Sequence, residues 1–84
     1  MAEVTFAPGA ITGGENIDLP AGSPAVERVV AARHHAMSDG TAAGASTAPT
    51  PTKVDKNTIT IDEATTTRSI LTLQYEAVGE LAKP

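Results

Sequence analysis

The sequence predicts a mainly α-helical chain with an extended N-terminal arm and a disordered linker, and without an autonomous globular core. Three observations support this prediction. Apolar residues at helical spacing concentrate near the C-terminus, the aromatic residues are limited to Phe6 and Tyr75, and no cysteine is present to form a disulfide. A chain of 84 residues rarely buries enough apolar surface to fold without a disulfide or a similar cross-link. We therefore expect the chain to become ordered by assembly with a partner.

Residues 1–22 are predicted to form an extended arm. Glycine and proline interrupt this stretch repeatedly, which disfavours a helix, and its apolar residues are isolated from one another. The segment Val4-Thr5-Phe6 suits a short strand if a sheet edge is available. Two interpretations remain open here, a flexible arm and an arm that docks on a neighbouring subunit.

Residues 23–38 are predicted to form a short helix. Ser23 is a suitable N-cap, and Pro24 occupies the first helical position, where a missing N–H costs nothing. The larger apolar side chains share one helical face, and they are Val26, Val29, Val30 and Met37. A helix of this length is marginal by itself in water.

Residues 39–57 are predicted to form a flexible linker. The stretch is rich in alanine, threonine and proline, and Val54 is its only large apolar residue. Such a composition cannot bury enough surface to offset the entropy lost on ordering.

Residues 58–84 are predicted to form a C-terminal amphipathic helix with a short extended lead-in. Thr60 and Asp62 are the candidate helix caps. Threonines in the first half and a glycine near the end weaken the helix, so we expect packing against a partner to hold it. The predicted assembly interface is Ile70, Leu71, Leu73, Gln74, Tyr75, Ala77, Val78 and Leu81.

The charge pattern argues against nucleic-acid and membrane partners. The net charge is −4, and the six basic residues are scattered, whereas nucleic-acid binding needs a basic face. No apolar run is long enough to span a bilayer. The N-terminal residues lack the basic and apolar regions of a cleaved signal peptide.

Candidate chemistry is sparse, and we expect no catalytic residue, cofactor or metal. His34 and His35 are adjacent, so on a helix their side chains diverge by about 100° and cannot share a metal. Helix capping explains the pair Asp62-Glu63, and no nucleophile elbow of the Gly-x-Ser-x-Gly type occurs. The sequence therefore predicts that the chain is not an enzyme.

One stretch resembles a known family. Residues 55–62, Asp-Lys-Asn-Thr-Ile-Thr-Ile-Asp, followed by Leu73-Gln74-Tyr75, resemble the C-terminal part of bacterial flagellar proximal-rod proteins and of type III secretion inner-rod proteins. The resemblance implies a structural subunit of a helical rod or adaptor that packs against its own copies or related subunits through the C-terminal helix. It also implies a place in an envelope-spanning basal body or secretion apparatus, reached without a cleaved signal.

Two other hypotheses remain open. A small bacteriophage virion accessory protein, such as a capsid cement or tail component, would also be free of cysteine, poor in aromatic residues and equipped with arms. A regulator whose helix enters a groove on another protein is the third hypothesis. On the rod hypothesis, we expect a mostly unfolded monomer that gains helix when it assembles.

Overall fold

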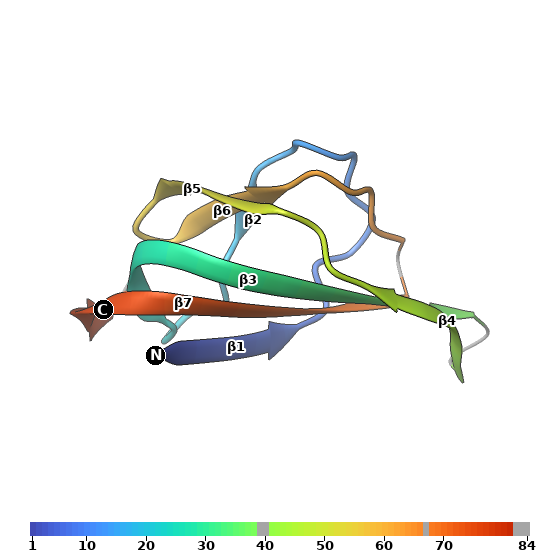
Figure 1. The fold of residues 1–84 in the computed structure, drawn as a ribbon, viewed down its shortest axis with the longest axis horizontal. Coiled ribbons are helices and arrows are strands. Elements are labelled where there is room, and N and C mark those ends of the chain that lie inside the picture. The colour runs from blue at the N-terminus through green and yellow to red at the C-terminus, as the bar shows by residue number, and fades with distance from the viewer. Residues whose placement is uncertain (39–40, 67, 82–84) are drawn as a thin grey trace.

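A computed structural model describes residues 1–38, 41–66 and 68–81. The strands form two antiparallel sheets that lie face to face (Figure 1). The four-stranded sheet has the order β1-β7-β3-β4 and consists of β1 (Ala2–Phe6), β7 (Ser69–Leu81), β3 (Pro24–Ser38) and β4 (Thr41–Thr47). The three-stranded sheet has the order β2-β6-β5 and consists of β2 (Ile17–Asp18), β6 (Thr58–Ile61) and β5 (Pro51–Asp55).

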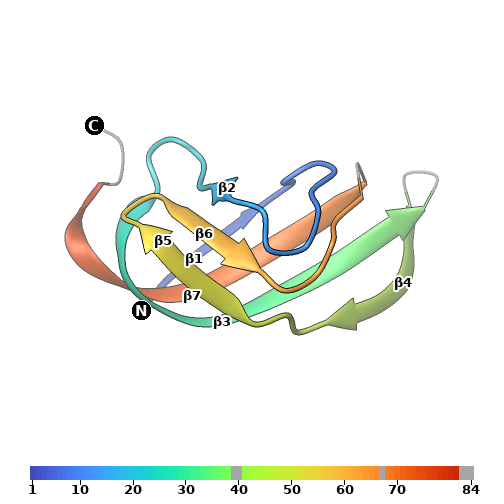
Figure 2. The ribbon, with the colours of Figure 1, turned by 90° about the horizontal axis from the view of Figure 1, so that it is seen from above.

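The chain crosses repeatedly between the two sheets (Figure 2). Two hairpins, β3–β4 and β5–β6, each stay within one sheet. β5 also lies beside the first half of β3, where the Val26 amide donates to the Lys56 carbonyl oxygen at 2.8 Å. β5 therefore covers one half of β3, while β4 pairs with the other half.

The prediction of a mainly α-helical chain without a core is wrong. The described residues contain no helix, so that part of the chain holds no helix long and apolar enough to cross a membrane. The two sheets enclose a buried core made of Ile17, Leu19, Val26, Ala32, Ile59, Ile61, Leu71, Leu73 and Tyr75. Aliphatic side chains from both sheets thus supply the core that the scarcity of aromatic residues seemed to exclude.

The helix predicted over 23–38 is the long strand β3, and bulges explain the error. The register between β3 and β7 shifts at three places. At two of them, between Val26 and Arg28 and between Val29 and Ala31, β3 carries one extra residue, and a bulge of this kind sets two residues against one. Val26, Val29 and Ala32 consequently all face the core at a spacing of three residues. A bulged strand thereby imitates the i, i+3 spacing of an amphipathic helix.

The helix predicted over 58–84 is also replaced by strands. Thr58–Ile61 is β6, so the extended lead-in is present, but Ser69–Leu81 is the strand β7. Along β7, buried Leu71, Leu73 and Tyr75 alternate with half-buried polar residues, which is the period-2 pattern of a strand. The apolar residues assigned to one wide face of the predicted helix therefore lie on both faces of this strand. Residues 82–84 of the predicted helix lie outside the described residues.

The predicted arm and linker are ordered as well. The short strand considered near Val4 is present as β1 at the edge of the four-stranded sheet. The stretch 39–57 supplies β4, β5 and the turn into β6, except that residues 39–40 lie outside the described part. Neither stretch is a free tether between helices, because each pairs with the sheets.

The three predicted helix caps have other roles. Ser23 is buried, and its hydroxyl donates to the Pro20 carbonyl oxygen at 2.6 Å in the turn before β3, where Gly22 has a positive φ of 86°. Thr60 lies within β6. The Asp62 carboxylate accepts a hydrogen bond from the Thr50 amide at 2.7 Å. These polar residues stabilise turns and crossings between sheets, where a side chain can satisfy backbone groups that no strand pairs.

Candidate functional site

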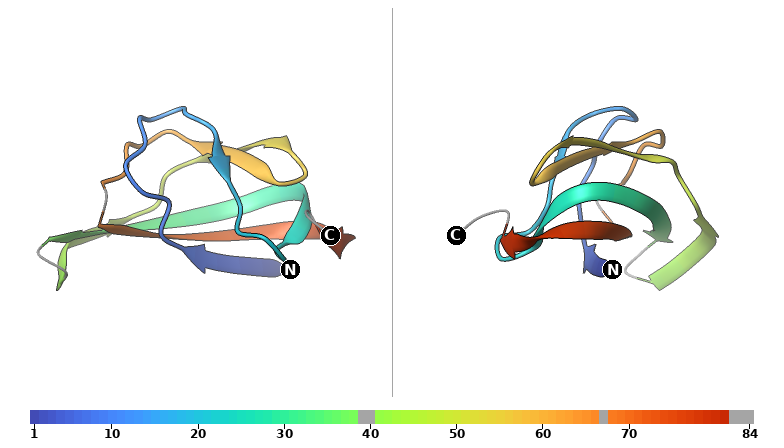
Figure 3. Two further views of the ribbon diagram at one scale, coloured as in Figure 1. Left: turned by 180° about the vertical axis from the view of Figure 1, so that it is seen from behind. Right: turned by 60° about the vertical axis from the view of Figure 1, so that its left-hand side comes forward.

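The β3–β4 hairpin extends past the two-sheet body. β3 has 15 residues and β7 has 13, whereas β5 has five and β6 has four. In Figures 1 and 2, β4 accordingly lies beyond the end of the three-stranded sheet. The right-hand view in Figure 3 shows that β4 also turns away from that sheet. Along Thr41–Thr47, β4 has β3 as its only strand partner among the described residues.

The outer face of the four-stranded sheet is polar and hollowed. Cross-strand pairs there include Thr5 with Thr72, whose hydroxyl oxygens lie 3.0 Å apart, and Gln74, which donates to the Glu3 carboxylate at 3.0 Å. A hollow of about 550 Å³ opens on this side, lined by Glu3, Ala31, Ala32, Arg33, Ala48, Thr72 and Gln74. Its lining combines acidic and basic residues with several alanines, so it does not indicate one class of ligand.

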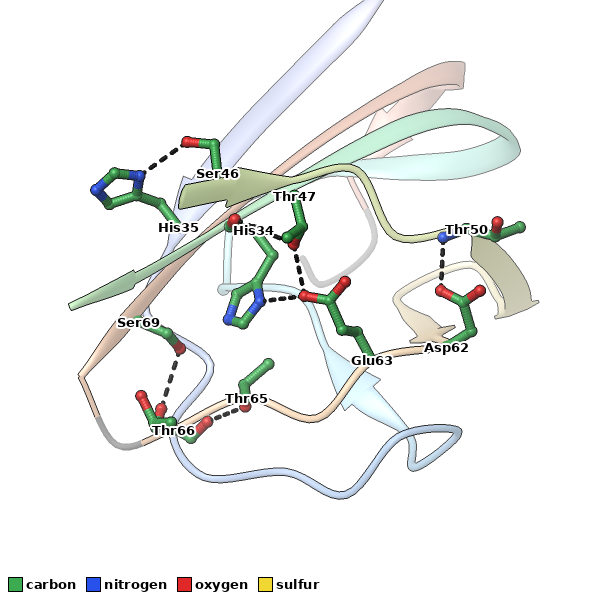
Figure 4. A network of polar contacts seen from close by, with 11 residues as sticks. His34, His35, Ser46, Thr47, Thr50, Asp62, Glu63, Thr65, Thr66 and Ser69 are labelled. Atoms are coloured by element: carbon green, nitrogen blue, oxygen red, sulfur yellow. Dashed lines mark hydrogen bonds and ion pairs between the residues drawn. The ribbon is translucent and has the colours of Figure 1, made fainter. Parts of the chain in front are cut away.

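A buried histidine joins the base of the hairpin to the β6–β7 connection (Figure 4). His34 is only 5% exposed. Its Nδ1 lies 2.7 Å from Glu63 Oε1, and the Thr47 hydroxyl donates to the same oxygen at 2.6 Å. The cluster therefore links β3, β4 and the segment after β6. His35 points to the opposite side of β3 and contacts the Ser46 hydroxyl at 2.9 Å.

The shared carboxylate has a shifted pKa. The hydrogen bonds from Thr47 and then from His34 favour the ionised form, so they hold the pKa of the Glu63 carboxyl below its usual value, against the smaller opposing effect of burial. An ionised carboxylate only accepts hydrogen bonds, so the proton of the contact with His34 belongs to Nδ1. Nε2 of His34 is buried and has no hydrogen-bond partner among the described residues.

The geometry of this cluster differs from that of a catalytic triad. In a Ser-His-Asp triad, the hydroxyl contacts the imidazole and the carboxylate orients it. Here the Thr47 hydroxyl contacts the Glu63 carboxylate instead. Among the described residues, no three His, Cys, Asp or Glu side chains are grouped as metal ligands would be.

The predicted interface residues separate into buried and exposed positions on β7. Leu71, Leu73 and Tyr75 are completely buried inside the chain itself, so a partner cannot reach them in this fold. Val78 is 41% exposed. Three further residues of the predicted interface are half-buried, and they are Ile70, Gln74 and Ala77. The last one, Leu81, pairs with Pro24 of β3.

The strand order and the surface together define a small antiparallel β-sandwich with a projecting hairpin. The chain matches no protein-family model, no curated protein and no solved structure.

Sequence reasoning missed the contact between His34 and Glu63. The two residues are 29 positions apart, and a strand crossing between sheets brings them together. The available signal was the alternation Ile59, Ile61 and then Leu71, Leu73, Tyr75, which predicts two strands and hence a crossing that includes Glu63.

Proposed function

We propose that the chain is a non-catalytic structural subunit of a large assembly, and that this assembly is a virion in which it serves as a capsid cement or tail component. The projecting β3–β4 hairpin is the observation that supports this proposal most directly. The proposal keeps the predicted role as an assembly subunit and moves the contact surface from a helix to strand edges.

The hairpin has the properties of an attachment arm. β7 pairs with β3 as far as Ala36, so the described pairs Met37–Ala42 and Ser38–Thr41 form a two-stranded end beyond it, and a two-stranded ribbon by itself is marginally stable in water. The sequence of β4, TAAGAST, contains no proline and no charged residue. Those are common devices that keep an edge strand from pairing with another chain. An edge without them suits the addition of a strand from a neighbouring subunit.

The β fold favours the virion hypothesis over the rod hypothesis. The rod hypothesis depends on a C-terminal helix packed into a helical tube. In this chain, the residues that carry the resemblance form the β5–β6 turn, the strand β6 and the middle of β7. Membership of the rod family stays a prediction, without helix packing to support it.

Copurification with particles tests the proposal. The chain is expressed in its native host, and virions and membrane-embedded export complexes are separated on density gradients. We expect the chain in the virion fraction. Its presence in the export complex instead would favour the rod hypothesis, and its absence from both fractions would overturn an assembly role.

A hairpin variant tests the attachment surface. Replacing residues 36–45 with an Asn-Gly turn retains the pairs His34–Thr47 and His35–Ser46 and uses a turn that suits two-residue hairpin loops. We expect this variant to fold but to be lost from particles. The matched control is Val54→Thr, an exposed change on β5, which we expect to be incorporated normally. Equal incorporation of the shortened variant would show that the hairpin is not the attachment arm.

A further inference from the structure

We propose that the free edge of β1 pairs with β1 of a second copy of the chain. The two strands would run antiparallel about a two-fold axis at Val4 and would join the two four-stranded sheets into one. This surface differs from the β3–β4 hairpin, so the inference goes beyond the proposed attachment to an assembly.

In the part of the chain that the structure describes, β1 is an edge strand whose one strand partner is β7. All five residues of β1 pair with β7, from Ala2 opposite Tyr75 to Phe6 opposite Leu71. Among the described residues, no backbone hydrogen bond joins β1 to any other segment. Figure 3 shows β1 as the last strand of its sheet.

β1 differs from the other edge strands because it combines five residues with a continuous register. β2 has two residues, which is too short to serve as a template. β5 begins with Pro51, carries Lys53 and has an irregular register near Asp55, and short strands, proline, lysine and bulges all discourage edge pairing. β4 pairs irregularly with β3 and has no large apolar side chain. β1 has a continuous register, no proline and no lysine.

The core is incomplete along this edge. Ala2, Val4 and Phe6 pack against the core but are only half-buried. Beyond Phe6, a hollow of about 570 Å³ opens between the edges of the two sheets, with Phe6, Pro8, Ile11 and Ile17 in its lining. A second copy at this edge would cover the same apolar side chains, and each Å² removed from water contributes about 25 cal/mol.

The sequence of β1 is self-complementary in one register. With the axis at Val4, Glu3 lies opposite Thr5 of the second copy, and Ala2 lies opposite Phe6. The Glu3 oxygen that does not bind Gln74 can then accept a hydrogen bond from that threonine. Opposite polar pairs of this kind stabilise a sheet.

Other registers are disfavoured by charge or by proline. An axis at Glu3 would set two carboxylates directly opposite each other, and like charges at that position destabilise a sheet. An axis at Thr5 would set Pro8 opposite Ala2, and proline cannot donate to the ladder. A parallel, in-register pair would also bring the two Glu3 side chains together. Because the edge has only five residues, we expect a weak dimer that forms readily at the high local concentration of an assembly.

Cysteine cross-linking tests the register directly, because the chain has no cysteine of its own. Two exposed single substitutions are made, Glu3→Cys and Thr5→Cys. With the axis at Val4, position 3 of one copy lies directly opposite position 5 of the other copy. Two cysteines at position 3, or two at position 5, would lie diagonal to each other. Directly opposite residues lie within disulfide range, whereas diagonal ones, about 7–8 Å apart, do not.

We expect a covalent dimer when the two variants are mixed and oxidised, and none with either variant alone. A dimer from one variant alone would overturn the Val4 axis. A mixture that stays monomeric while both variants melt cooperatively, or cysteines that cross-link to a different particle protein, would overturn self-pairing. The shortened-hairpin variant keeps β1 and should cross-link equally, so this proposal and the proposed function fail separately.

Discussion

At the scale of single residues, Tyr75 connects two strands through the core. It is completely buried, and its hydroxyl donates to the Pro24 carbonyl oxygen at 2.6 Å. The contact holds the middle of β7 against the first residue of β3. Burial disfavours the charged phenolate, so the pKa of the Tyr75 phenol is raised.

This phenol predicts a loss of stability in alkali. Because the pKa of the phenol is higher in the folded state, its contribution to folding stability is complete below the pKa of the unfolded state, about 10. This contribution disappears as the pH rises through the pKa of the folded state. The Tyr75→Phe variant loses this hydrogen bond, so its free energy of unfolding at neutral pH should fall by about 0.5–1.5 kcal/mol. Its stability should nevertheless depend less on pH in alkali. Tyr75 is the only tyrosine, so phenolate absorbance reports its ionisation directly. Titration at the pKa of free tyrosine in folded protein would contradict the prediction.

Glu63 predicts the opposite response, in acid. Its pKa is lowered by hydrogen bonds from Thr47 and His34, so its contribution is complete above the unfolded value, about 4.3, and is lost as the pH falls through the folded value. Glu63→Gln should therefore lower the urea midpoint at pH 7 more than at pH 3.

The matched control for this comparison is Glu27→Gln. Glu27 is exposed, and its carboxylate makes no hydrogen bond or ion pair with any described residue. We expect its urea midpoints to follow the unmodified chain at both pH values. An equal loss for Glu63→Gln at pH 7 and pH 3 would show that the carboxylate acts by shape rather than by charge.

At the scale of elements, β3 contains bulges where it pairs with β7. Val29 lies opposite Tyr75, and Ala31 lies opposite Gln74, so Val30 is the extra residue between them. Val30 is 45% exposed. Because Val30 is the extra residue, its removal would leave Val29 opposite Tyr75 and Ala31 opposite Gln74, with their side chains on the faces that they already occupy.

Deleting Val30 should therefore cost less than emptying a core position. The deletion would join Val29 directly to Ala31 in regular pairing with β7 and would leave Val26 and Val29 facing inward, so we expect a cost below about 2 kcal/mol, against about 2–5 kcal/mol for a large core side chain cut back to alanine. The matched change Val30→Thr keeps the bulge and should stay within about 0.5 kcal/mol. Urea unfolding measures both, and a loss of about 3 kcal/mol or more for the deletion would show that the bulge itself positions the core side chains.

The same elements show what the sequence could predict. Alternation around Ile59 and Ile61 correctly indicates the strand β6, because that strand has no bulge on its own inward positions. The pattern of β3 misleads because bulges give its core residues a spacing of three, and the sequence Ser23-Pro24 imitates a helix start. The His34–Glu63 contact was beyond local reasoning, since a crossing between sheets brings these residues together.

At the scale of the whole molecule, folding and assembly are separable. The sequence predicts a chain that orders only with a partner, because few large side chains are available. Instead, both sheets contribute to one core, and β3 and β7 are the two strands in most extensive contact. The partner surfaces we propose, the hairpin and the β1 edge, lie at the margins of this core, so association adds to a fold that already exists.

Two substitutions on β7 test this separation. Leu73 is completely buried, and Val78 on the same strand is 41% exposed. Leu73→Ala should cost about 2–5 kcal/mol, a large part of the roughly 5–15 kcal/mol of a typical domain, whereas Val78→Asp should change stability by less than about 0.5 kcal/mol. Circular dichroism melts are recorded at concentrations where sedimentation shows a monomer.

The unmodified monomer should show a strand spectrum and one cooperative transition whose midpoint does not change on dilution. That midpoint should fall for Leu73→Ala and stay in place for Val78→Asp. A non-cooperative melt of the dilute chain would instead mean that a partner completes the core. In that case both substitutions would act through association, and their effects would grow as the protein is diluted, because binding to a partner stabilises by mass action.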